Sequence, residues 1–306
     1  MGVQIAFQQM IILFFGILVG FIAVKAKLLD QNGSKVITTL VMNIILPCFI
    51  VSSGLTSSQI ITGTEMLLYF GLSLVCYLVA YIIGTLISYL PIVPKGEKRI
   101  YRFMTTFGNT GFIGLPVIGA LFGSDAVFYA TIFNLPFNFL VFSVGILLVS
   151  DDASVKNVNP KMFFNSCLVA SVLAIVIYLS GLQLPEIVSS CLNEMGQATV
   201  PLAMIITGAS LGRESARNIF ADVSLYIVTI AKALVVPIFT YLVLSAFITN
   251  PVMVQVGTVL MAMPVATNAT LLCLQYGGPD RTASRGVFLS TLLSVITIPL
   301  FVLVLG

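Results

Sequence analysis

The chain has 306 residues, of which 58% are hydrophobic and only 8% are charged, whereas soluble domains average about 25% charged residues. This composition excludes a soluble globular domain and predicts an integral membrane protein. The net charge of +3 comes from 14 basic and 11 acidic residues, which are too few for the basic face that binds nucleic acid. The sequence has no His, so imidazole metal ligands and imidazole general bases are excluded.

Ten apolar runs, each long enough to cross a bilayer core of about 30 Å as a helix, follow one another along the chain. We predict helices over residues 5–24, 36–53, 65–90, 101–122, 126–149, 162–181, 190–211, 223–248, 252–276 and 286–305. A transmembrane barrel would need segments of about ten residues that alternate polar and apolar side chains, whereas these runs are long and apolar on all sides. The first run lacks the basic start and cleavage site of a signal peptide, so it is expected to remain in the mature protein.

The basic residues are distributed along the chain in a way that predicts the orientation of the helices. Thirteen of the 14 lie in or beside the odd-numbered connections: Lys25, Lys27, Lys35, Lys95, Lys98, Arg99, Arg102, Lys156, Lys161, Arg213, Arg217, Arg281 and Arg285. Short basic connections stay on the cytoplasmic side, so both chain termini are expected to lie outside.

A polar connection over residues 151–161 divides the chain into two parts, 1–150 and 162–306, with five predicted helices each. Because five is odd, the second part enters the membrane from the side opposite to the first. This is the condition for an inverted-topology repeat. We therefore predict two inverted five-helix repeats joined by a short cytoplasmic linker.

The fourth predicted helix of each repeat contains residues that break helices. In the first repeat, Gly108, Gly111 and Gly114 precede Pro116, and in the second, hydroxyl and amide side chains follow Pro264. Gly lowers helix propensity and Pro removes a backbone donor. Irregular backbone at this depth survives only inside protein or beside a water-filled cavity. Paired interruptions indicate a midplane binding site in a transporter, although close helix packing also uses Gly and Pro.

The helix starts beside the predicted breaks favour the binding of an anion. The part of a helix that follows a break begins with unpaired N–H groups and the positive end of its dipole, and such a start binds a carboxylate. Neutral donors and acceptors near these starts or on other helices are the candidate substrate-binding residues: Asn109, Thr110, Thr267, Asn268, Thr270, Asn134, Asn138 and Asn43. No metal site is expected, since the five Cys form no close pair.

Lys232 is the one basic residue deep inside a predicted helix. It is either a counter-charge for an anionic substrate or a residue whose long side chain extends to the cytoplasmic interface, and both interpretations stay open. No Asp or Glu lies at the middle of a predicted helix, so a carboxylate proton relay is not supported. Two alternatives for ion coupling stay open: transport is coupled to a sodium ion, or it is not coupled to any ion. The membrane potential acts on a monovalent anion with about 2.3 kcal/mol per 100 mV, which favours export.

Several segments carry a family resemblance: Gly108-Asn109-Thr110, Gly114-Leu115-Pro116, Pro264, the run 276–280, Ser290-Thr291 and Ile298-Pro299. Together they resemble the auxin efflux carrier family, which includes plant auxin exporters and bacterial permeases for malate, malonate and other organic anions. The resemblance covers essentially the whole chain. It implies that helices 4 and 9 cross at their broken points, that Gly111, Gly114, Pro116 and Pro264 lie at this helix crossover, and that one helix bundle is a scaffold and the other a transport domain.

The chain departs from the plant members in two ways. It has Ala269 where they carry a second proline, and its central connection is short. It therefore looks like a bacterial member in the cytoplasmic membrane, and auxin is not assumed to be the substrate.

These observations predict an all-α integral membrane protein of ten helices that transports a small organic anion, a carboxylate, by alternating access. Export driven by the membrane potential is the first hypothesis; a sodium-coupled symporter and an anion channel are the alternatives. An enzyme is not expected, because no His and no acidic pair within the membrane is available. The expected partners are the substrate and the lipid bilayer, with a second copy of the chain left open, and no cofactor other than a sodium ion is expected.

Overall fold

The computed structural model describes residues 3–56, 61–150, 166–213 and 222–305. Within these ranges every regular secondary-structure element is a helix, which confirms the predicted all-helical class. Five helices of the described residues are long and apolar enough to cross a membrane: Gln31–Leu55, Gly63–Ser88, Asp125–Val149, Val223–Phe247 and Asp280–Val302. Shorter apolar helices lie at Phe15–Lys25, Thr110–Phe122, Ser166–Ser180 and Pro251–Met261. The protein is therefore a multi-pass membrane protein.

Each predicted run overlaps one or more observed helices. Those before residue 150 are α1 (Val3–Lys25), α2 (Gln31–Leu40), α3 (Leu46–Thr56), α4 (Gly63–Ser88), α5 (Lys98–Thr106), α6 (Leu115–Phe122), α7 (Ser124–Leu140) and α8 (Ile146–Val149). Those after residue 165 are α9 (Ser166–Ser180), α10 (Glu186–Gln197), α11 (Thr199–Arg213), α13 (Val223–Ile230), α14 (Val236–Phe247), α15 (Pro251–Met261), α16 (Asn268–Tyr276) and α17 (Asp280–Leu305). The polar linker 151–161 lies outside the described residues.

Shorter helical turns join several of these helices. Wide π-helical turns form η1 (Val41–Ile45), η3 (Thr110–Gly114), η4 (Val141–Gly145) and η7 (Ala231–Val235), and a 3₁₀ turn, η2 (Lys95–Glu97), precedes α5. Three of the wide turns stand directly before a helix whose second residue is proline: Pro47, Pro116 and Pro237. A proline ring clashes with the carbonyl four residues back. In each case the residue before the proline instead bonds to the carbonyl five residues back, so the wide turn accommodates the ring.

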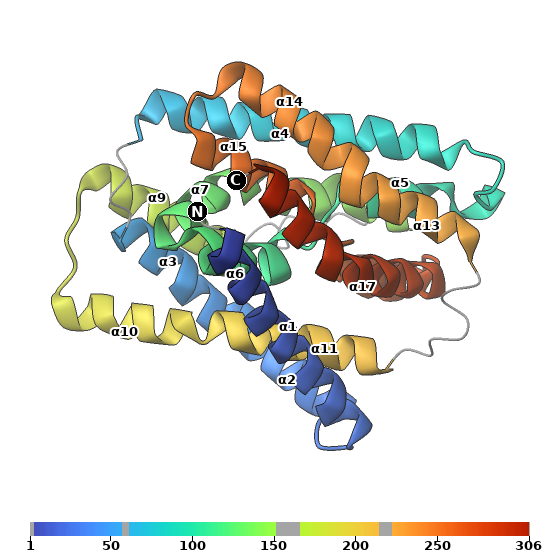
Figure 1. The fold of residues 1–306 in the computed structure, drawn as a ribbon, viewed down its shortest axis with the longest axis horizontal. Coiled ribbons are helices and arrows are strands. Elements are labelled where there is room, and N and C mark those ends of the chain that lie inside the picture. The colour runs from blue at the N-terminus through green and yellow to red at the C-terminus, as the bar shows by residue number, and fades with distance from the viewer. Residues whose placement is uncertain (1–2, 57–60, 151–165, 214–221, 306) are drawn as a thin grey trace.

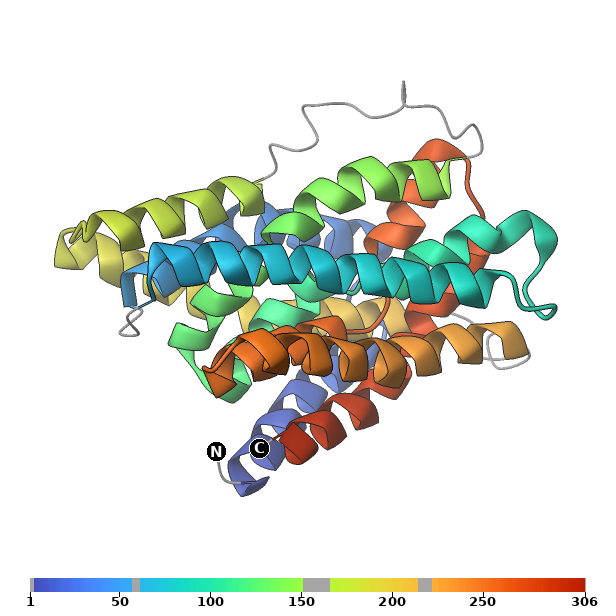
Figure 2. The same cartoon turned by 90° about the horizontal axis from the view of Figure 1, so that it is seen from above.

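The helices pack in layers along the long axis of the molecule (Figure 1). In this view α4 and α14 lie along the upper edge, α10 and α11 lie along the lower edge, and α6 and α7 lie between them. The start of α1 and the end of α17 lie side by side in both views (Figure 2). The interrupted helices α5–α6 and α15–α16 therefore occupy the interior, where the other helices cover their irregular backbone.

Among the described residues, α1 of the first predicted repeat packs very closely against α11 of the second. A Cβ atom added at Gly20 of α1 would lie 1.9 Å from the carbonyl oxygen of Ile205, and one added at Gly208 of α11 would lie 1.8 Å from that of Ile17. Only glycine fits at such distances, and small residues let membrane helices approach this closely. The contact holds α1 directly against α11.

Candidate functional site

Two helices of the interior are interrupted and cross each other. Residues 107–109 separate α5 from η3, and residues 262–267 separate α15 from α16. Gly108 and Val265 form an antiparallel β-bridge. The Asn109 amide donates to the carbonyl of Pro264 at 2.7 Å, and the Ala266 amide donates to the carbonyl of Phe107 at 3.0 Å. We call these two interrupted segments the crossing; each supplies the hydrogen bonds that the other loses by leaving the helix.

Neighbouring helices complete the backbone hydrogen bonds of the crossing. The amide of Val265 donates to the hydroxyl of Ser290 in α17 at 3.0 Å. Ser290 belongs to the Ser290-Thr291 segment noted in the sequence, but no pattern there indicated this bond. A Cβ atom at Gly108 would lie 3.2 Å from the carbonyl oxygen of Met263 and 3.2 Å from Nζ of Lys232. Gly108 is therefore needed for the close approach of the two segments.

The extended backbone lies upstream of the residues that were expected at the crossover. Gly111 and Gly114 belong to η3, which continues directly into α6, and Pro116 is the second residue of α6, where the wide turn accommodates its ring. Pro264 lies within the interruption, and its carbonyl accepts the Asn109 amide. A Cβ atom at Gly114 would lie 2.9 Å from Cδ2 of Leu260, so this glycine serves packing against α15.

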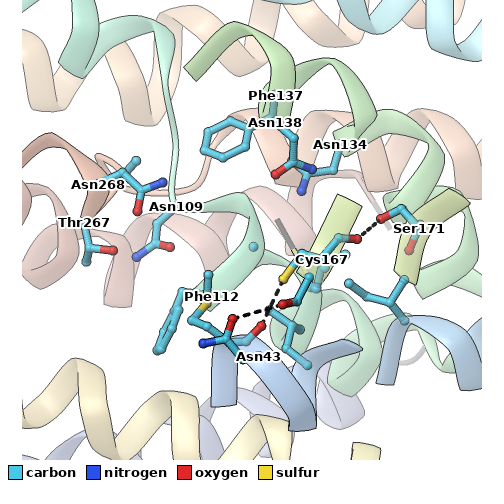
Figure 3. A pocket seen from close by; sticks show the side chains of 18 of the residues that line it. Asn43, Asn109, Phe112, Asn134, Phe137, Asn138, Cys167, Ser171, Thr267 and Asn268 are labelled. Carbon is cyan, nitrogen blue, oxygen red and sulfur yellow. Dashed lines mark hydrogen bonds between the residues drawn. The ribbon is translucent and has the colours of Figure 1, made fainter. Parts of the chain in front are cut away.

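A cavity of about 130 Å³ lies beside the crossing (Figure 3). We call it the pocket; its lining residues are Met42, Asn43, Leu46, Ile50, Asn109, Gly111, Phe112, Leu115, Thr131, Asn134, Phe137, Asn138, Phe142, Ser166, Cys167, Ser171, Ala266, Thr267 and Asn268. This lining, drawn from the described residues, contains amides, hydroxyls and apolar groups but no charged side chain. The pocket thus brings together six of the candidate residues: Asn43, Asn109, Asn134, Asn138, Thr267 and Asn268.

Two helix starts border the pocket. η3 begins after Asn109 and α16 begins after Thr267, and neither start has a side-chain cap within the described structure. The Asn109 side chain is 4% exposed, and its Nδ2 has no hydrogen-bond partner among the described residues. A buried donor without a partner is costly unless a ligand accepts its hydrogen bond. Figure 3 shows Asn109 and Asn268 on one side of the pocket and Asn134 and Asn138 on another.

Hydrogen bonds to neighbouring residues fix the side chains of Asn134 and Asn43. The hydroxyl of Thr110, which does not line the pocket, donates to Oδ1 of Asn134 at 2.5 Å. Because its oxygen accepts this bond, Asn134 presents its amide nitrogen as a donor. Asn43 is exposed, donates to the carbonyl of Thr39 at 2.9 Å and accepts from the hydroxyl of Ser166 at 3.0 Å. It therefore ties α9 to the helix that runs from α2 to α3.

The sequence did not indicate that α9 contributes to the pocket. Ser166, Cys167 and Ser171 line it, and the thiol of Cys167 lies 3.5 Å from the carbonyl oxygen of Met42. These residues belong to α9, whose sequence contains no glycine or proline that would mark an interruption. Thr270, which was a candidate, is not a lining residue.

Lys232 lies on another side of the crossing. It is 1% exposed, its Nζ donates to the carbonyl of Thr106 at 3.3 Å, and it is not a lining residue of the pocket. Its side chain therefore reaches the end of α5 and does not extend to the interface.

The comparisons with known proteins agree with this architecture. A family model described as "Membrane transport protein" matches residues 5–161 and 150–302. The chain belongs to the auxin efflux carrier family. The description of the family model indicates a transporter.

Three relatives resemble this auxin efflux carrier family protein over nearly its full length, each at 25% identity. An uncharacterised transporter of Methanothermobacter thermautotrophicus aligns over 94% of this chain and 95% of its own length. An uncharacterised transporter of Methanocaldococcus jannaschii aligns over 97% and 98%. A protein of Rhizobium meliloti named "Putative malonate transporter" aligns over 93% and 91%.

Proposed function

We propose that this protein is a secondary transporter that moves a small carboxylate across the cytoplasmic membrane by alternating access. The observation that carries the proposal is the pocket, a neutral cavity that two helix starts border and that the side chain of Asn109, with its unpartnered amide, lines. Each helix start contributes about half a positive charge. Two such starts supply about one charge, which matches one carboxylate group without a buried cation.

The size of the pocket limits the substrate. An apolar protein cavity of about 150 Å³ holds benzene, so a cavity of about 130 Å³ suits a ligand of about six non-hydrogen atoms. A short carboxylate or dicarboxylate has this size. The amide donors of Asn134 and Asn138 would bind the part of the ligand that lies away from the helix starts. The name of the Rhizobium meliloti relative supports a substrate of this class.

The arrangement of the helices supports ten transmembrane helices in two inverted repeats. The two interruptions fall in the fourth predicted helix of each repeat. In Figure 1 the α4–α5 connection and the start of α13 lie at one end of the molecule, and the α9–α10 and α14–α15 connections lie at the other. The first end carries Lys95, Lys98 and Arg99, so by the positive-inside rule it faces the cytoplasm and both termini face outward.

The same orientation supports an inward-facing pocket. Its lining extends from the crossing to Asn43 and to Ser166 at the start of α9, which follows the basic central connection. A substrate would enter from the cytoplasm, and the membrane potential would drive the export of an anion.

The test is transport by the purified protein in liposomes. Labelled mono- and dicarboxylates of three to five carbons should show saturable counterflow, with malonate among the substrates, and an imposed inside-negative potential should accelerate export. Unitary currents would indicate a channel, and a requirement for a sodium gradient would indicate a symporter. An absence of carboxylate flux across the whole panel would refute the proposal.

A further inference from the structure

The crossing has a second pair of helix ends, and these carry the opposite charge. α5 ends at Thr106 and α15 ends at Met261, and both ends lead into the crossing. The C-terminal end of a helix carries about half a negative charge and carbonyls without helical partners. Two C-terminal ends therefore create about one negative charge on the side of the crossing away from the helix starts that border the pocket.

Lys232 places its ammonium at the end of α5, beside the crossing. Its Nζ donates to the Thr106 carbonyl at 3.3 Å. Nζ and the carbonyl oxygen of Met263 each lie 3.2 Å from the point where a Cβ atom of Gly108 would stand. The ammonium therefore bonds to the end of α5, and the Met263 carbonyl of the other segment borders the same space, which the absence of a side chain at Gly108 leaves free.

The surroundings of Lys232 give it no other partner of opposite charge. The side chain is 1% exposed, and within the described residues no ion pair joins it to an Asp or Glu. A buried ammonium is unfavourable unless other groups compensate its charge. Here the compensation comes from carbonyl dipoles at helix ends, which is the environment that binds sodium in other transporters with broken helices.

We propose that the Lys232 ammonium is a built-in cation that occupies, at the end of α5 and beside the crossing, the position that a free sodium ion would take. The ammonium then neutralises the negative charge of the helix ends permanently, so the crossing needs no monovalent cation for its stability. For the transport cycle, where the inference rests on the proposed function, it follows that carboxylate export is independent of sodium.

The first experiment measures the thermal stability of the full-length protein in detergent, without substrate, in sodium, potassium or N-methylglucamine chloride at equal ionic strength. The wild type should have one melting temperature in all three salts. Lys232→Ala should melt at a lower temperature in N-methylglucamine, and sodium should raise it by about 3 °C or more by binding the vacated position.

Two further variants separate the charge from packing. Lys232→Met keeps the length of the side chain but fills the position, so it should be destabilised equally in all three salts. Lys35→Ala removes an exposed cation and should behave as the wild type does.

Three results would overturn the inference. They are a wild type that sodium stabilises, a Lys232→Ala protein as stable as the wild type in N-methylglucamine, and a Lys232→Ala protein that no small cation stabilises. If Lys232→Ala does not fold, the inference is judged on the other two proteins. Any stabilisation of the wild type or of Lys232→Met by sodium would then contradict it. Because these measurements need no substrate, their outcome is distinct from a failure of carboxylate transport.

Discussion

Replacing Asn109 by Ala separates a binding residue from a structural one, because the two roles predict opposite effects on stability. Its Nδ2 is buried without a partner in the described structure, and such a group costs about 1–3 kcal/mol. Asn109→Ala removes this cost, so the empty protein should unfold at an equal or higher temperature. A hydrogen bond to a charged ligand contributes about 1.5–3 kcal/mol, so carboxylate affinity should fall by about 10- to 150-fold.

The assay is isothermal titration with the transported carboxylate together with thermal unfolding of the same samples. Asn250→Ala is the matched control, because Oδ1 of Asn250 accepts the Val252 amide at 3.0 Å and caps α15 far from the pocket. Loss of this cap should cost about 1 kcal/mol of stability and leave the affinity unchanged. The reasoning fails if Asn109→Ala lowers the melting temperature as Asn250→Ala does while the affinity stays at the wild-type value.

Two further substitutions test the packing and the crossing. Gly208→Ala would place a Cβ atom 1.8 Å from the Ile17 carbonyl oxygen and should destabilise the protein by more than about 3 kcal/mol. The control is Gly71→Ala, whose Cβ atom would meet no atom within 4 Å. In thermal unfolding this control should be neutral or stabilising. Ser290→Ala leaves the Val265 amide without its hydroxyl acceptor, and should cost about 1–3 kcal/mol and slow counterflow; a variant with wild-type stability and flux would show that water replaces the hydroxyl.

The sequence predicted the parts of the structure that depend on local composition. Long apolar runs form the helices, since the bilayer core requires every backbone group to bond within its own segment. The interruption of two of them followed from Gly and Pro. Six candidate residues line the pocket because polar side chains inside apolar runs have few other positions that avoid lipid.

The sequence could not predict contacts that arise only when distant segments meet. The non-helical residues 107–109 lie before Gly111 and Pro116 because the bridge to Val265 fixes their conformation, and that partner is more than 150 residues away. The bond from Lys232 to Thr106 depends in the same way on how α13 and η7 pack against α5. The serines of α9 carry no local signal, because Ser occurs throughout membrane helices, mostly bonded to its own backbone.

The hydrogen bonds of the site indicate which parts move together during transport. Backbone bonds join the two interrupted helices to each other, and the bond of Thr110 to Asn134 adds α7 to this unit. The opposite wall of the pocket, made by η1, α3 and α9, faces this unit across the cavity. Alternating access should therefore move the crossing as one body past this wall, as in other transporters with rigid moving bundles.

A cross-linking experiment tests this division. In a protein whose only cysteines are Cys167 of α9 and a replacement of Phe112 in η3, a short dithiol reagent would tie the wall to the moving unit and should abolish counterflow. The control pairs Cys167 with a replacement of Met42, whose carbonyl lies 3.5 Å from the thiol. Both pairs place the linker in the pocket, so blocking the cavity affects them equally. Inhibition by the second pair measures this blockage, and the additional inhibition by the first pair measures movement past the wall. A first pair that inhibits no more than the second would contradict the rigid-body division.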